Sequence, residues 1–204
     1  MDVQDPASIR DCVQDIVQAH GKIDLLVNNA GSGYLATLEE TSDAALASVM
    51  DVNFFGVWRV TQAVFPLMRA AGDGRIETIT SIGGPIGQAF NDAYCAAKFA
   101  VEGFMESLAP VAQRMGVQVV LVEPGPVNTE FVASVRSKAQ ASGTELEAYR
   151  PLREAYLAAA AQAFASIGQA GSDIANIIAD AADAADAATR PTRRRRTFAM
   201  PART

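Results

Sequence analysis

The chain has 204 residues, of which 50% are hydrophobic and 20% charged, and this balance is typical of a single globular domain. Its net charge of −6 argues against general nucleic-acid binding, and it contains no apolar run of the roughly 18 residues that a membrane span needs. The sequence has two cysteines without a pairing pattern, a single histidine and no signal segment at Met1. We therefore expect a cytoplasmic protein without a metal site or a membrane anchor.

The first segments predict a helix followed by a buried strand. Asp5 and Pro6 are typical of a helix start, and Gly21 is typical of a helix end. The apolar run 23–27 predicts a parallel strand buried on both faces. Small residues at 28–33 follow this strand, and they allow a ligand to approach the backbone closely.

A long helix is predicted over about 43–70, and it carries Asn53 among apolar neighbours. A buried amide must find hydrogen-bond partners or it costs a few kcal/mol. Asn53 therefore either bonds to the helix backbone or serves a binding site.

The central segments repeat the alternation of strand and helix. Residues 75–80 predict a strand that ends at Ser81, a helix follows over about 93–113, and the β-branched run 117–122 predicts another strand. The stiff turn 123–129 lies at the carboxyl end of that strand, where open α/β sheets bind ligands.

Tyr94 and Lys98 stand four residues apart on the predicted helix, so they share one face. A tyrosine is a poor base at neutral pH, and a nearby ammonium lowers its pKa by favouring the phenolate. Ser81, on the loop after a strand, can bond the same substrate oxygen. The set predicts a proton-transfer site, although Tyr and Lys at this spacing also occur by chance on ordinary helices.

The last third of the chain is helical in propensity and rich in alanine. We interpret 130–171 as a mobile cover over the substrate site, with surface helices as the alternative. Ser172 begins a further helix, and 189–204 forms a C-terminal strand and tail. The four arginines at 193–196 are either a solvated run or a site for a phosphate or an acidic partner.

The alternation of helices and strands indicates an α/β fold with a doubly wound, Rossmann-like parallel sheet. The motifs in this order resemble the short-chain dehydrogenase/reductase family, and look most like its 17β-hydroxysteroid and retinol dehydrogenase branch. They are NNAG at Asn28–Gly31, Asn53 in DVNFFG, Ser81, YCAAK at Tyr94–Lys98 and PGPVNT at 124–129.

This resemblance implies an NAD(P)-dependent oxidoreductase that interconverts a secondary alcohol and a ketone. Tyr94 would be the general acid/base, Lys98 would lower its pKa and hold the nicotinamide ribose, and Ser81 would orient the substrate oxygen. Asn53 would anchor a water that connects Lys98 to solvent. The resemblance also implies a homodimer or homotetramer. The implied cofactor-binding residues are Asp2, Val3, Asn29, Ala30, Gly31, Tyr94, Lys98, Pro124, Gly125, Val127 and Thr129.

The sequence departs from the family in lacking its opening strands and its TGxxxGxG turn, which binds the pyrophosphate. We therefore expect 1–204 to be a single partial domain, truncated at the N-terminal side, with an exposed edge at 23–27 and little affinity for a dinucleotide by itself. The choice between NAD and NADP is not readable. A non-catalytic, dimerising interaction protein is the alternative function, and an epimerase or dehydratase is a third.

Overall fold

The computed structural model describes residues 1–129, 145–183 and 196–199. The helices are α1 (Pro6–His20), α2 (Asp43–Met50), α3 (Gly56–Ala71), α4 (Asp92–Arg114), α6 (Arg150–Ile167) and α7 (Gly171–Asp183), with a π-helical turn at Asp51–Phe55 and a 3-10 turn at Glu147–Tyr149. The strands are β1 (Leu25–Asn28), β2 (Gly74–Ile79), β3 (Val117–Pro124), β4 (Val127–Asn128), β5 (Gln169–Ala170) and β6 (Arg196–Ala199).

The main sheet has the strand order β1-β2-β3-β6, and each neighbouring pair runs parallel. The predicted α/β class with a parallel, Rossmann-like sheet is therefore confirmed. Among the described strands β1 forms one edge of the sheet, where Leu25 and Val27 remain 39% and 37% exposed. The short strands β4 and β5 form a separate parallel pair.

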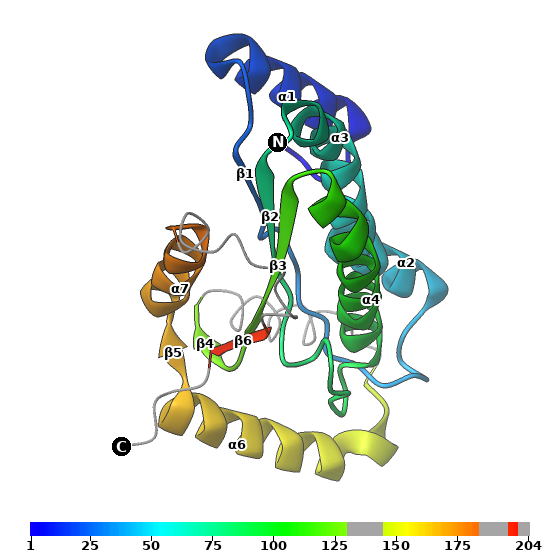
Figure 1. Cartoon of the computed structure of the whole chain (residues 1–204). Coiled ribbons are helices and arrows are strands. Elements are labelled where there is room, and N and C mark those ends of the chain that lie inside the picture. Colours follow the sequence, from blue (N-terminus) through cyan, green and yellow to red (C-terminus); the bar gives the residue numbers. More distant parts are fainter. Residues whose placement is uncertain (130–144, 184–195, 200–204) are drawn as a thin grey trace.

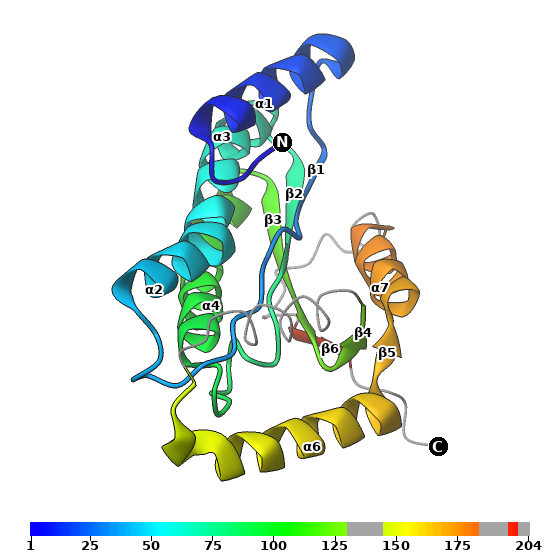
Figure 2. The same cartoon turned by 180° about the vertical axis from the view of Figure 1, so that it is seen from behind.

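Helices cover both faces of the main sheet (Figures 1 and 2). On one face α3 and α4 lie against β1, β2 and β3, with α1 packed outside α3. On the other face α7 contacts β2 and β3, and α6 crosses the end of the molecule beyond the sheet. The core lies between the sheet and the α3–α4 layer, where Met68, Ile76 and Met105 are completely buried.

The first helix begins and ends where the sequence predicts. The Asp5 carboxylate accepts a hydrogen bond from the Ala7 N–H at 2.8 Å, which satisfies one of the free donors at the helix start. Gly21 ends the helix with φ of +79°, a conformation that residues with a side chain rarely adopt. Local capping chemistry therefore fixes both ends of α1.

The single helix predicted over 43–70 is wrong in one respect, because the π-helical turn Asp51–Phe55 separates α2 from α3. A π-turn inserts one extra residue into the helix and shifts the faces that follow it. The sequence prediction also missed β4 and β5, which have two residues each. Residues 130–144 of the predicted cover and 184–195, with most of the arginine run, lie outside the described residues.

Within the described part of the chain, no helix is both long enough and apolar enough to cross a membrane. The same residues contain no group of three or more His, Cys, Asp or Glu side chains placed to hold a metal ion.

Candidate active site

A cavity of about 1130 Å³ lies beside the carboxyl ends of the first three strands. The strand ends contribute Val27, Ile79 and Pro124 to its lining, and α6 and α7 form its far walls. All four residues with a predicted catalytic role line this cavity: Asn53, Ser81, Tyr94 and Lys98. The structure therefore brings together side chains that come from the π-turn, from the loop after β2 and from α4.

Tyr94 and Ser81 meet at the start of α4. Tyr94 lies in the first turn of that helix, and its side chain forms a hydrogen bond with the side chain of Ser81. Two backbone bonds hold the serine loop: the Gly83 N–H donates to Ser81 Oγ at 3.1 Å, and the Ile82 N–H donates to the Pro124 carbonyl at 3.0 Å. The pair thus has a fixed position beside the end of β3.

Lys98 is buried one helical turn after Tyr94, with 5% of the residue exposed. Its Nζ donates to the Ile79 carbonyl at 3.0 Å and lies 5.9 Å from the centroid of the Tyr94 ring. Burial lowers the pKa of Lys98 from 10.5 to about 8, although the Glu102 carboxylate one turn further favours the charged form. Burying the charged ammonium of Lys98 therefore lowers the stability of the folded protein.

The expected effect of Lys98 on the acidity of Tyr94 does not match this state of the site. Burial raises the pKa of Tyr94 above its usual value, and the hydrogen bond with Ser81 opposes that rise. The ammonium bonds to the Ile79 carbonyl and lies over the tyrosine ring. Tyr94 is consequently a protonated phenol at neutral pH, ready to donate a proton.

Asn53 is completely buried in the π-turn, and its amide is satisfied by backbone groups. Its Nδ2 donates to the Ser32 carbonyl at 2.8 Å and to the Val49 carbonyl at 3.0 Å, while its Oδ1 accepts from the Ser32 N–H at 3.1 Å. These bonds join the helix to the loop after β1. The backbone-bonding interpretation of Asn53 therefore holds, and the residue also lines the cavity.

Gly31 lies where that loop approaches the side chains of Asn53 and Lys98. A Cβ atom at this position would stand 3.0 Å from Asn53 Oδ1 and 3.8 Å from Lys98 Nζ. The contact at 3.0 Å is tighter than a side chain normally allows, so the bare backbone keeps this corner of the cavity open. A narrow, polar corner of this kind suits a ring or ribose that must lie flat against the chain.

The predicted cofactor residues fall into two groups. The cavity lining includes Tyr94 and Lys98 and also Asn29, Gly31, Pro124, Gly125, Val127 and Thr129. Asp2, Val3 and Ala30 lie outside that lining. The Asp2 carboxylate accepts a hydrogen bond from the Gln4 N–H at 2.9 Å, whereas Val3 and Ala30 line a separate hollow of about 50 Å³.

The sequence predicted that 130–171, which includes α6, covers the site, but it assigned no individual residue to the far wall of the cavity. Tyr156 and Phe164 of α6 and Ile174 and Ile178 of α7 line it, together with several alanines. Asn91 also lines it and donates to Tyr156 Oη at 2.7 Å. Tyr156, Ala160 and Phe164 recur at a four-residue spacing, but in a run rich in alanine that spacing does not single out one face.

Comparisons with known proteins agree with these motifs. A family model described as short chain dehydrogenase matches residues 1–140. Human retinol dehydrogenase 8 is 42% identical over 181 residues, which are 87% of this chain and 57% of that protein. Human 17-beta-hydroxysteroid dehydrogenase type 1 is 38% identical over 183 residues, 89% of this chain and 55% of that protein. The chain thus spans about half the length of these curated relatives.

A solved structure of an alcohol dehydrogenase is also similar to this chain. The alcohol dehydrogenase from the archaeon Thermococcus sibiricus, complexed with 5-hydroxy-NADP, superposes with a TM-score of 0.61 at 27% identity. The match covers 66% of this chain and 56% of that one.

Proposed function

The chain belongs to the short-chain dehydrogenase family, and we propose on that premise that it is the catalytic part of an NAD(P)-dependent oxidoreductase that interconverts a secondary alcohol and a ketone. One observation carries the proposal: Ser81, Tyr94 and Lys98 line a single cavity, and a hydrogen bond joins the first two side chains. Their order along the chain also matches the family motifs.

The cavity fits the nicotinamide end of such a cofactor. Gly31 leaves the backbone bare beside Asn53 and Lys98, and the turn from Pro124 to Thr129 supplies the opposite side. When bound, the nicotinamide would supply or accept the hydride. Lys98 would bind its ribose, because a buried ammonium gains most from a polar partner.

Tyr94 is the general acid and base of the proposed reaction. Its raised pKa keeps the phenol protonated at neutral pH, so it can give its proton to a carbonyl oxygen. Ser81 donates a hydrogen bond to the same oxygen and keeps it beside Tyr94. In the oxidation direction Tyr94 must first lose its proton, so oxidation is favoured at higher pH.

The substrate is proposed to be bulky and apolar. The far wall of the cavity is formed by Leu157, Phe164, Ile174 and Ile178, which offer few polar groups to a small hydrophilic ligand. The names of two relatives, a retinol dehydrogenase and a 17-beta-hydroxysteroid dehydrogenase, make retinoids and steroids the first compounds to test.

A turnover assay tests this function. Purified chain would be mixed with a steroid or retinoid carbonyl compound and with NADH, NADPH or reduced nicotinamide mononucleotide, and the loss of reduced nicotinamide would be followed. The mononucleotide is included because the proposed site residues would surround the nicotinamide end of the cofactor. Comparing NADH with NADPH gives the preferred cofactor.

A matched pair of serine variants makes the assay specific. Ser81→Ala should lower the rate by about tenfold or more, because the carbonyl oxygen loses a hydrogen bond that strengthens as charge develops on it. Ser107→Ala is the control, because Ser107 lies on the exposed side of α4 and donates to the Gly103 carbonyl of its own helix. Equal rates for the two variants would refute the role of Ser81.

A second candidate is a dimerising interaction protein. Phe54, Trp58 and Phe104 form a ring cluster on the π-turn, α3 and α4, with Trp58 and Phe104 centroids 4.6 Å apart. Phe55 and Trp58 remain 44% and 43% exposed beside this cluster. Exposed aromatic side chains of this kind favour a contact with a second copy, as a homodimer or homotetramer. A monomer in sedimentation that still turns over substrate would exclude the interaction role.

The cellular location is proposed from the cysteines. Cys12 and Cys95 are both free in the structure, and free thiols are compatible with a reducing compartment. Fractionation of cells that produce the protein would test this location.

A further inference from the structure

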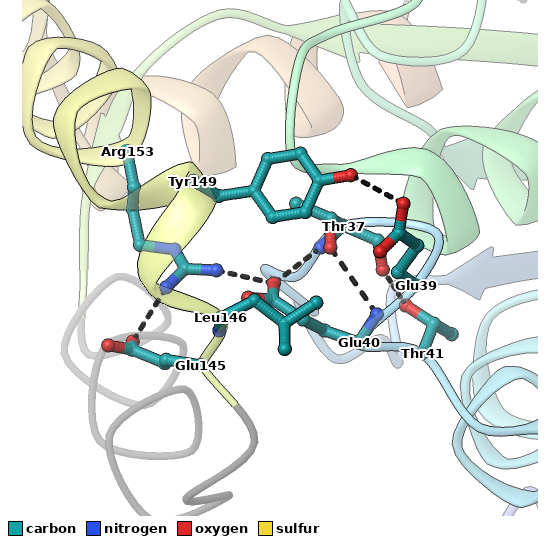
Figure 3. A network of polar contacts seen from close by, with 8 residues as sticks. All are labelled: Thr37, Glu39, Glu40, Thr41, Glu145, Leu146, Tyr149 and Arg153. Atoms are coloured by element: carbon teal, nitrogen blue, oxygen red, sulfur yellow. Dashed lines mark hydrogen bonds and ion pairs between the residues drawn. The ribbon is translucent and has the colours of Figure 1, made fainter.

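A buried ion pair joins the first turn of α6 to the loop that precedes α2 (Figure 3). Arg153 Nη2 donates to Glu40 Oε2, and the two side chains are only 9% and 2% exposed. The partners are 113 residues apart in the sequence. An ion pair removed from water is costly to form and is retained where its geometry is well satisfied.

The Glu40 carboxylate is satisfied on both oxygens. The Thr37 N–H donates to Oε2 at 3.0 Å, and the Leu146 N–H donates to Oε1 at 2.8 Å (Figure 3). Arg153 completes the set and also pairs with Glu145 at 3.3 Å. These donors hold the pKa of Glu40 at about 2 despite its burial, so the carboxylate is charged at any physiological pH.

The loop that presents Glu40 is itself ordered by hydrogen bonds. The Glu40 N–H donates to Thr37 Oγ1 at 3.3 Å, and Thr41 Oγ1 donates to the Thr37 carbonyl at 2.7 Å. The carboxylate is therefore held in place before α6 contacts it. Such preorganisation makes the ion pair a fixed anchor point.

A chain of contacts connects Arg153 to the wall of the cavity. Arg153 Cζ lies 5.8 Å from the centroid of the Phe90 ring, and that ring lies 5.4 Å from the ring of Tyr156. Tyr156 accepts a hydrogen bond from Asn91, and the Asn91 carbonyl accepts from the Cys95 N–H in the first turn of α4. Contacts thus run from the ion pair to the helix that carries Tyr94.

We propose that the Glu40–Arg153 ion pair is a latch that positions α6 as the substrate-binding wall of the cavity. Both residues are positioning residues, because they act through α6 and line no part of the cavity themselves. The inference rests on the proposed function only in treating the occupant of the cavity as a substrate. Its direct consequence is structural: without the latch, the first turn of α6 loses its buried ion pair with the body of the protein and keeps only weaker contacts, such as those of Tyr156 with Asn91 and Phe90.

Hydrogen exchange tests the latch without any need for turnover. In the full chain, Glu40→Gln should speed exchange of the amides of residues 150–160 by about tenfold, because a neutral amide loses the opposite charge and one of the two acceptor oxygens that hold the arginine and the loop. Glu39→Gln is the matched control: Glu39 immediately precedes Glu40, and it accepts an exposed hydrogen bond from Tyr149 Oη at 2.9 Å. Exchange in Glu40→Gln no faster than in Glu39→Gln would overturn the proposal.

A second set of measurements separates positioning from general damage. Arg153→Gln should give the same exchange pattern, and the double variant should be no worse than either single one, because one interaction is being lost. Additive effects of the two changes would contradict the latch. If Glu40→Gln unfolds, Arg153→Lys, which keeps the charge, supplies the comparison: it should speed exchange in α6 less than Arg153→Gln, and equal rates would contradict the latch.

Under the proposed function, loss of the latch should also weaken substrate binding. For a steroid or retinoid carbonyl compound, Glu40→Gln should raise KM by about tenfold and change kcat far less, since α6 contacts the substrate away from the reacting carbon. An equal fall in kcat at unchanged KM would contradict the positioning role. If even the unchanged chain shows no turnover, the proposed function fails while the exchange result still decides the latch.

Discussion

The buried charge of Lys98 should destabilise the folded protein, and replacing it by methionine should reveal the size of that cost. Methionine has nearly the length of lysine but carries no charge. At pH 7 the ammonium is charged in both the folded and the unfolded chain. Folding must therefore bury a charge that donates a hydrogen bond to the Ile79 carbonyl at 3.0 Å.

The magnitude follows from the change in pKa. Burial lowers the pKa of Lys98 from 10.5 to about 8, which corresponds to about 3 kcal/mol at ~1.4 kcal/mol for each pKa unit. Between these two values the unfolded chain binds more protons than the folded chain, so the free energy of unfolding rises with pH. About 2 kcal/mol of the cost should be relieved between pH 7 and pH 9.5, whereas the lost hydrogen bond of the variant, about 1 kcal/mol, does not depend on pH.

Urea denaturation at pH 7 and pH 9.5 measures the effect. Lys98→Met should be about 2 kcal/mol more stable than the unchanged chain at pH 7 and about equal to it at pH 9.5. Lys22→Met is the control, because the Lys22 side chain is 65% exposed and should show no such gain. A difference between Lys98→Met and the unchanged chain that is the same at both pH values would refute the reasoning.

Two further substitutions test the corner of the cavity beside Lys98. Asn53→Ala should lower the free energy of unfolding by about 2–3 kcal/mol in urea denaturation, because it removes a partner of the buried Val49 carbonyl and of the partly buried backbone groups of Ser32. A loss below about 0.5 kcal/mol would contradict this. Gly31→Ala should weaken the binding of reduced nicotinamide mononucleotide, measured by fluorescence titration, while the melting temperature changes little. The reason is that the added Cβ would stand 3.0 Å from Asn53 Oδ1 and narrow this corner of the cavity. Unchanged binding would show that the mononucleotide does not use this corner.

The parts of the fold with strong local signals could be predicted from the sequence. Asp5, Pro6 and Gly21 mark both ends of α1 because capping depends on adjacent residues. The parallel sheet follows from continuous apolar runs alternating with helices. The π-turn at Asn53 could not be predicted, because Phe54, Phe55, Val57 and Trp58 make the helix apolar on several sides there and so hide the shift of its faces.

The sequence predicted four side chains that share the cavity (Asn53, Ser81, Tyr94 and Lys98), but three predicted cofactor residues, Asp2, Val3 and Ala30, lie outside the cavity lining, and the electrostatics were not predicted. The spacing of Tyr94 and Lys98 places both on one face, but it does not say which acceptor the ammonium bonds, and here that acceptor is the Ile79 carbonyl. The far wall depends on contacts across long stretches of sequence, such as Glu40 with Arg153. An alanine-rich helix contains no local signal for such a contact.

The rate of Tyr94→Phe in carbonyl reduction tests the central claim, that this phenol transfers the proton. The substitution removes one oxygen atom and keeps the ring that Lys98 faces. With reduced nicotinamide as donor, we expect Tyr94→Phe to lose a factor of about 10² to 10⁴ in kcat, while Tyr34→Phe, outside the cavity lining, keeps its rate. A Tyr94→Phe variant that turns over as fast as Tyr34→Phe would contradict the account.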